Sequence, residues 1–175
     1  MTDKERELID QLIGETISKE QFALEFNVDS TYVKQLLEVA YDEKNEDDVD
    51  FLNYVIFGFN LVTEDYVDLL CRLMYAPWHH QHEDIATIFQ SFRFPQTVEC
   101  LYKTAQTQFE YLEYDDSYAL AVKCIWALGD INTEESRKKL ELLSVSENEI
   151  IRENALKQLQ RKYFLKTNYL NIPED

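Results

Sequence analysis

Apolar residues recur along this chain at intervals of three and four, the spacing that places them on one face of an α-helix. The pattern predicts ten helices, which begin near residues 3, 18, 30, 47, 63, 82, 95, 117, 133 and 146. Ser18 and Gln21 have the spacing of a capping box, and Thr133 stands where an N-cap is expected. Gly14 and Gly129 are expected to end helices.

The expected core consists of the apolar residues on these helical faces, and on the short second helix it includes Phe22, Leu24 and Phe26. The other N-caps are expected at Ser30, Asp47 or Asp48, Thr63, Ser117 and Ser146. Three Gly and three Pro residues are too few to punctuate a many-stranded sheet. The fold is therefore predicted to be all-α, with short connections that favour antiparallel neighbours.

Composition limits the class of protein to which the chain can belong. A chain of 175 residues that is 45% hydrophobic can bury a substantial core, so we expect one folded domain over residues 1–175 rather than an acidic disordered chain. The start of the chain is mixed in charge, and no run approaches 18 apolar residues. We therefore expect a cytoplasmic protein with no membrane partner, and reduced core cysteines at Cys71, Cys100 and Cys124.

The net charge of −17 limits the kinds of molecule that the chain is expected to bind. So acidic a surface repels phosphate backbones, which argues against direct nucleic-acid binding and favours a basic protein partner. The charge is also uneven, because residues 1–90 hold 20 acidic and 6 basic residues, whereas residues 91–175 hold 14 and 11. The N-terminal half therefore carries most of the net negative charge.

The sequence contains little that indicates the active site of an enzyme. His79, His80 and His82 lie close together, but they lack the spacing of a helical zinc site and follow Pro77 at a turn. They are expected either to end one helix and cap the next or to titrate within a binding surface. Phosphate-loop, dinucleotide and nucleophile-elbow motifs are absent, so we expect no catalytic residue, no cofactor and no metal.

A shift of 31 positions aligns apolar residues in the C-terminal part. It places Ala119 and Leu120 on Ile150 and Ile151, and it also aligns Cys124-Ile125 with Ala155-Leu156 and Leu128 with Leu159. The stretch Ala121-Val122-Lys123-Cys124-Ile125-Trp126-Ala127-Leu128-Gly129-Asp130-Ile131, with Ile151-Arg152-Glu153-Asn154-Ala155-Leu156, resembles the HEAT-repeat family. The resemblance implies a short α-solenoid of stacked helical hairpins over residues 61–175, preceded by a helical cap over residues 1–60.

Two segments are candidates for binding a basic partner. The first has six carboxylates within nine residues at a predicted helix start. We expect these carboxylates to steer the partner; the alternative is that they form only a solvated loop. Its members are Asp42, Glu43, Glu46, Asp47, Asp48 and Asp50. The second lies between helices and interleaves acids with tyrosines, which suit direct contact unless the tyrosines pack beneath the connection. Its members are Glu110, Tyr111, Glu113, Tyr114, Asp115 and Asp116.

In size, charge and repeat type the chain is similar to the HEAT-like immunity proteins of bacterial toxin systems, including contact-dependent growth inhibition. That resemblance implies an antitoxin: a monomer that forms a 1:1 heterodimer with a nuclease toxin domain and covers its cationic substrate-binding surface. The alternative is a HEAT-like adaptor that holds a peptide of a larger assembly. A DNA glycosylase needs a basic groove, which the charge of residues 1–90 argues against.

Overall fold

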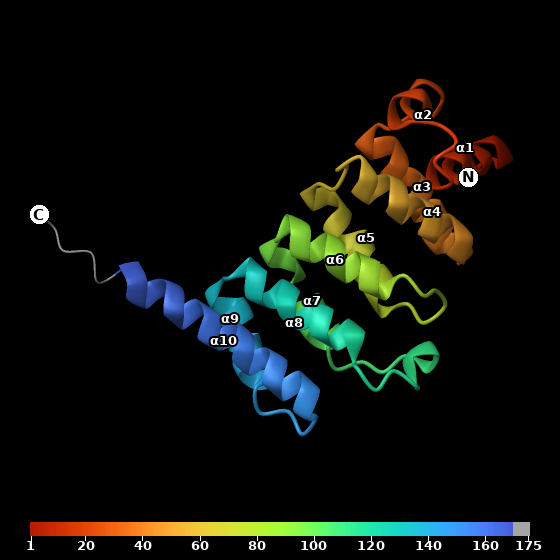
Figure 1. Ribbon diagram of the computed structural model, residues 1–175. Coiled ribbons are helices and arrows are strands. Elements are labelled where there is room, and N and C mark those ends of the chain that lie inside the picture. Colours follow the sequence, from red (N-terminus) through yellow and green to blue (C-terminus); the bar gives the residue numbers. More distant parts are fainter. Residues whose placement is uncertain (170–175) are drawn as a thin grey trace, which may run out of the picture. The chain divides into compact units, whose positions relative to one another are not determined.

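The computed structural model describes residues 1–169, with side chains described as far as residue 161, and this part of the chain is helical and contains no strand (Figure 1). Residues 170–175 of the predicted C-terminal hairpins lie outside the described residues. The α-helices are α1 (Asp3–Ile13), α2 (Lys19–Glu25), α3 (Ser30–Glu43), α4 (Glu46–Gly58), α5 (Val67–Tyr75), α6 (His82–Phe92), α7 (Val98–Thr104), α8 (Ala119–Ile131), α9 (Glu134–Leu143) and α10 (Glu149–Tyr169). The all-α prediction is confirmed.

Short 3₁₀ helices complete the described elements: η1 (Glu64–Tyr66) and η2 (Pro95–Thr97) lead into α5 and α7, and η3 (Glu110–Leu112) lies between α7 and α8. Within the described residues, no helix combines the length and the apolar character needed to cross a membrane. The chain divides into two compact units, Met1–Ile85 and a second unit that begins at Ala86. The division falls inside α6, whereas the sequence suggested a change in regularity after residue 60.

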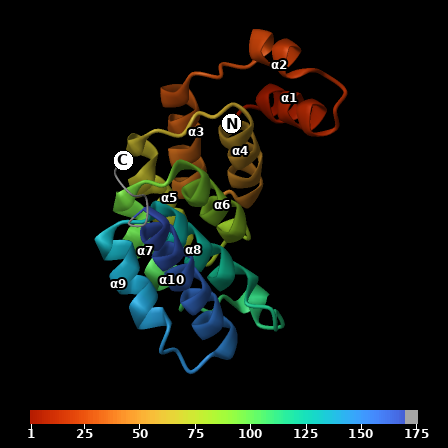
Figure 2. The ribbon, with the colours of Figure 1, turned by 60° about the vertical axis from the view of Figure 1, so that its left-hand side comes forward.

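In the first unit, α1 packs against α2 and α4, and α3 packs against α4 (Figures 1 and 2). An aromatic cluster closes the α2 end, where the Phe22 ring stacks on Phe26 at 4.7 Å between centroids and lies 5.4 Å from Phe59. The prediction that Leu24 joins this core is wrong, because the side chain is 86% exposed. Leu24 lies two residues after Phe22, which places it about 200° around the helix from the buried face, and within α2 only Phe22 is buried.

In the second unit, α8 packs against α7, α9 and α10, and α10 also packs against α9, beside which it runs in both views (Figures 1 and 2). The segments that the 31-residue shift aligns therefore lie in contact. Leu120 and Ile151 are both buried, as are Cys124 and Ala155. A helix covered on several sides needs apolar residues around most of its circumference, which explains why most of α8 is buried.

The helix starts follow capping chemistry. The predicted capping box of Ser18 and Gln21 is present, and Thr133 forms a similar reciprocal pair with Ser136. Other caps differ by one to three residues from the prediction, because a nearby Asp or Asn side chain reaches the free backbone N–H groups. They are Asp29 for α3, Asn45 for α4 and Asn148 for α10. Ser30 instead donates its hydroxyl to the Leu61 carbonyl at 2.8 Å.

Gly129 was predicted to end this helix, but it lies within α8. The helix ends at Asn132, which adopts the left-handed conformation with φ 57°. The glycine serves close packing of α8 on α10, because a Cβ atom placed there would lie 2.8 Å from Cδ and 3.0 Å from Cγ of the buried Gln158. A side chain at this position would therefore require the Gln158 side chain to shift.

We predict that Gly129→Ala lowers the free energy of unfolding by about 1 to 3 kcal/mol, because the added methyl group overpacks the contact with Gln158. Adding Gln158→Ala to it should recover part of this loss, since contacting residues couple. Gly58→Ala in α4 is the matched control, because its Cβ would lie no closer than 3.8 Å to a neighbour. Equal urea-denaturation losses for the two alanine variants would contradict this account.

Candidate protein-binding surface

The first predicted segment spans the end of α3 and the first turns of α4. Asn45 caps α4, which places Glu46 and Asp47 in the first turn, where the helix dipole favours carboxylates. Asp42, Glu43, Asp47 and Asp50 are exposed, and Glu46 is half-buried with Oε1 2.7 Å from Nδ1 of His80. Most of the predicted steering residues therefore do lie at the surface of the first unit.

These carboxylates act on one another. Partial burial raises the pKa of Asp50, and the negative charges of Asp84, Asp47 and Glu46 raise it further. Asp84, near the start of α6, was not among the predicted site residues, because sequence spacing does not show which helix starts converge. A carboxyl group whose pKa is raised by its neighbours indicates an excess of negative charge at this place.

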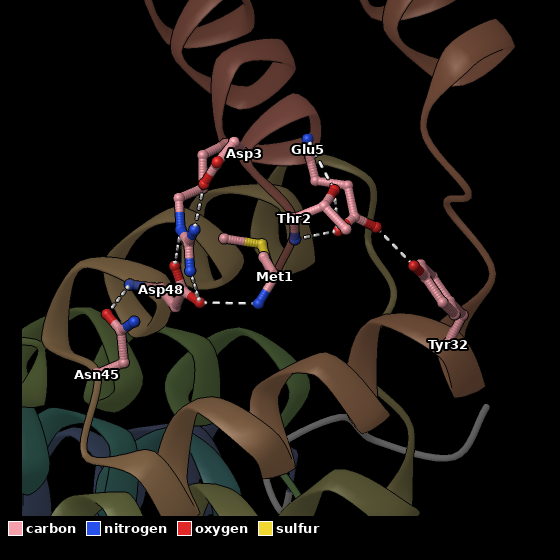
Figure 3. A network of polar contacts seen from close by, with 8 residues as sticks. Met1, Thr2, Asp3, Glu5, Tyr32, Asn45 and Asp48 are labelled. Atoms are coloured by element: carbon pink, nitrogen blue, oxygen red, sulfur yellow. Dashed lines mark hydrogen bonds and ion pairs between the residues drawn. The ribbon is translucent and has the colours of Figure 1, made fainter.

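Asp48 does not belong to this surface, so its predicted steering role is wrong. Its side chain is completely buried, and it accepts hydrogen bonds from Arg6 Nε at 2.7 Å, from Arg6 Nη2 at 3.0 Å and from the Met1 amino group at 3.0 Å (Figure 3). Burial alone would raise the pKa of Asp48, but these hydrogen bonds and positive charges outweigh it and hold the pKa below its usual value. Asp48 thus ties the start of α1 to α4.

The helical phase contained a signal for this role. Asp48 lies four residues before Leu52 and seven before Val55, so it shares the buried face of α4. A second contact of the same N-terminal segment reaches α3, where the Tyr32 hydroxyl donates to Glu5 at 2.5 Å (Figure 3). An acid in phase with the core predicts a buried ion pair rather than a surface charge.

We predict that Asp48→Asn lowers the free energy of unfolding by about 1 to 3 kcal/mol, because it removes the buried carboxylate that pairs with Arg6 and the Met1 amino group and leaves Arg6 only the exposed Asp3. Asp47→Asn is the matched control, since this exposed neighbour removes the same charge and should change stability by less than about 0.5 kcal/mol. Chemical denaturation of both variants measures the difference. Similar small effects at both positions would show that Asp48 is not essential to the packing of α1 on α4.

The second predicted segment connects α7 to α8 and contains η3. Tyr114 is 91% exposed, whereas Tyr111 is half-buried with its ring 6.0 Å from that of Phe109. Tyr114 therefore does not pack beneath the connection, which was the alternative to a contact role. Glu110, Glu113 and Asp116 are exposed, so this segment presents carboxylates around an exposed aromatic ring.

Asp115, which is half-buried, has a structural role that the sequence analysis did not predict. Its Oδ2 accepts from the Ala119 N–H at 2.7 Å, and its Oδ1 accepts from the Ser117 N–H at 3.0 Å and from the Ser117 hydroxyl. The Ser117 hydroxyl and these backbone groups lower the pKa of Asp115. The carboxylate thus supplies the cap of α8 that was expected from Ser117, and it holds Tyr118 in the left-handed conformation at φ 51°.

A cavity of about 250 Å³ lies beside this segment in the second unit. Its lining combines the chain after α7 with the start of α8 and two residues at the start of α10. The lining residues are Ala105, Gln106, Thr107, Gln108, Leu112, Glu113, Asp115, Asp116, Tyr118, Leu120, Ala121, Asn148 and Ile151. The cavity thus joins the predicted contact residues to side chains that the sequence did not single out, because tertiary packing alone brings Asn148 and Ile151 there.

The histidine cluster is structural. His79 Nε2 donates to the Leu73 carbonyl at 2.9 Å and His82 Nε2 to the Ala76 carbonyl at 3.0 Å, so both rings satisfy carbonyls at the end of α5. Gln81 N–H donates to His79 Nδ1 at 3.0 Å, which fixes the neutral form of that ring. The expectation that the cluster ends a helix is confirmed, and the described residues contain no group of ligands suited to a metal ion.

Burial of these rings predicts a loss of stability in acid. Burial lowers the pKa of His79, and it lowers that of His82 from 6.5 to about 4. The unfolded chain therefore binds the proton more tightly than the folded chain does. The neutral His82 ring stabilises the fold fully above about pH 6.5, and this stabilisation is lost as the pH falls toward about 4. At pH 5 the free energy of unfolding is lower by about 2 kcal/mol.

Urea denaturation at pH 7 and pH 5 tests this prediction. His82→Gln should lose less stability between the two pH values than the wild type does, because it removes the group that takes up the proton. An acid loss that is the same in His82→Gln and in the wild type would contradict the assignment.

The described residues thus define an all-helical protein with carboxylates exposed in both units and an exposed tyrosine beside a cavity. Searches of protein-family models, curated proteins and solved structures found no match to the chain.

Proposed function

We propose that this chain binds and neutralises a basic protein partner. In its narrower form the proposal is an immunity protein, which inhibits a cognate nuclease toxin domain by covering the cationic surface that holds the nucleic acid. The narrower form rests on the resemblance to acidic HEAT-like immunity proteins, and it includes the proposal that the helical hairpins form a short solenoid. The protein would act as a 1:1 inhibitor in the cytoplasm, without catalysis.

The exposed tyrosine and carboxylates of the segment from Phe109 to Tyr118 are the observation that carries the proposal. Tyrosine combines rigid apolar area with a polar tip, and a fully exposed Tyr114 has a large area to bury on binding. From Thr104 to Val122 the chain contains no lysine or arginine. A surface that offers only negative charge around an aromatic anchor is complementary to a basic partner.

The first acidic segment supports the same proposal at longer range. Asp42, Glu43, Asp47 and Asp50 are exposed. The pKa of Asp50 is raised first by partial burial and then by repulsion from the negative charges of Asp84, Asp47 and Glu46. A basic partner would relieve that repulsion on approach. Nucleases hold phosphates with lysine and arginine, so a toxin domain of this class presents the charge that these carboxylates attract.

Affinity capture tests the proposal. The immobilised protein is incubated at low salt with lysate from its source, eluted with a salt gradient, and the eluted proteins are identified by mass spectrometry. We expect a basic protein with nuclease activity that adding this chain suppresses. A neutral or acidic partner that resists salt would contradict the proposal and favour the adaptor alternative, since apolar contacts respond weakly to salt.

Binding kinetics with the captured partner provide a sharper prediction. Tyr114→Ala should raise the dissociation rate by about tenfold or more, equivalent to about 1.4 kcal/mol, because it removes the aromatic anchor. Leu24→Ala is the matched control, because it also truncates a highly exposed apolar side chain but lies in the first unit, outside both acidic segments. An unchanged dissociation rate in Tyr114→Ala would remove this segment from the interface.

The association rate reports the steering role separately. Asp42→Asn combined with Glu43→Gln should lower the association rate several-fold at low salt and leave the dissociation rate nearly unchanged, since distant charges act mainly on encounter. Stopped-flow measurements at several salt concentrations give both rates. A rate of association that is insensitive to salt and to these substitutions would contradict steering.

A further inference from the structure

We infer that the cavity beside η3 and the start of α8 receives an arginine side chain of the basic partner. The inference rests on the proposed function and adds to it the chemical group that the partner inserts. Four features of the second unit carry it: the size of the cavity, its apolar wall, the acceptors at its edge and the absence of lysine and arginine among its lining residues.

The size fits one side chain. The cavity has a volume of about 250 Å³, which lies below the range of about 300 to 1,000 Å³ typical of sites for cofactors and other small molecules. A single long side chain that enters from a partner needs less room than such a ligand. The cavity is also bordered by the exposed segment proposed to contact the partner, so an inserted side chain would be continuous with that interface.

The wall provides apolar contact for the stem of the side chain. Leu120 and Ile151 are buried and Leu112 is half-buried, and all three line the cavity. The methylene groups of arginine pack against such aliphatic surface while the charged end stays near water. Tyr118 also lines the cavity and is 40% exposed, so its ring is available to a guanidinium plane.

The edge of the cavity provides hydrogen-bond acceptors. Glu113 and Asp116 are exposed lining residues, and their carboxylates accept hydrogen bonds. Thr107 donates its only hydroxyl hydrogen to the Lys103 carbonyl at 3.0 Å, which leaves lone pairs to offer a ligand. A ligand with several N–H donors and a positive charge matches these groups.

No base of this chain competes for the position within the lining segments. Arg152 follows Ile151 on α10, but its guanidinium is held by the carbonyls of Ser146 at 2.8 Å and Glu147 at 3.1 Å. Arginine suits the site better than lysine, because its planar fork can reach two carboxylates and is more weakly hydrated. Arginine is also enriched in protein interfaces, whereas lysine is depleted.

A peptide titration tests the inference without the natural partner. The probe is the blocked peptide acetyl-Gly-Gly-Arg-Gly-Gly-amide, followed by amide chemical shifts of the isotopically labelled protein. Two counterparts replace arginine by lysine or by citrulline, which keeps the shape of arginine and lacks its charge. We expect saturable shifts at Leu120, Ala121 and Ile151 with the arginine peptide, and affinities at least several-fold weaker with the other two.

Variants separate charge from shape. Glu113→Gln combined with Asp116→Asn should weaken binding of the arginine peptide about tenfold by removing the acceptor charges. Thr107→Trp should abolish the shifts by filling the cavity without changing the net charge. Glu64→Gln combined with Asp65→Asn is the matched control, which removes two exposed charges from the first unit, outside both acidic segments, and should leave the affinity unchanged.

The outcomes distinguish this inference from the proposed function. Shifts confined to the first acidic segment, equal binding of the citrulline peptide, or binding unaffected by Thr107→Trp would each overturn the arginine site. If the captured basic partner still bound with salt sensitivity and Tyr114→Ala still accelerated its dissociation, the proposed function would stand without this site. If no basic partner were captured but the arginine peptide bound as expected, the proposed function would fail while the cavity's preference remained.

Discussion

The excess of negative charge is the constraint on which the rest of this structure depends. With 34 acidic and 17 basic residues, the chain folds against its own repulsion, and it does so by giving selected carboxylates specific positive or N–H partners. Asp48 binds Arg6 and the Met1 amino group, Asp115 caps α8, and Asp29 caps α3. Carboxylates placed in this way stabilise the fold. Those left exposed, including Glu113 and Asp116, remain available for a partner.

Periodicity predicted much of the fold because burial and helical geometry impose the same spacing on every amphipathic helix. The starts of α1 and α6 agree with the prediction, as does the capping chemistry of α2 and α9. The errors have local causes. Gly129 was expected to end a helix through its conformational freedom. What matters at this position is instead that glycine has no side chain, because Gln158 fills the space that a side chain would take. Leu24 lies two residues after the buried Phe22 and therefore on the opposite face of α2.

The candidate site was predictable only in part. Composition and tyrosine spacing identified the segment around Tyr114, but they did not distinguish Asp115, a cap, from Glu113 and Asp116, which are exposed. Caps and surface charges have the same residue types, and only the backbone path separates them. The cavity has no sequence signal, because Asn148 and Ile151 reach it through the packing of α10 on α8. The Asp48 ion pair was recoverable from its phase on α4.

The central claim is that the segment between α7 and α8 contacts a basic partner. Hydrogen exchange of the backbone amides, measured with and without the captured partner, tests it most directly, because binding slows exchange where surface is covered. The account predicts slower exchange over residues 104–122 and at the start of α10, with smaller changes over residues 42–50. Slower exchange confined to other parts of the chain, with residues 104–122 unchanged, would contradict it.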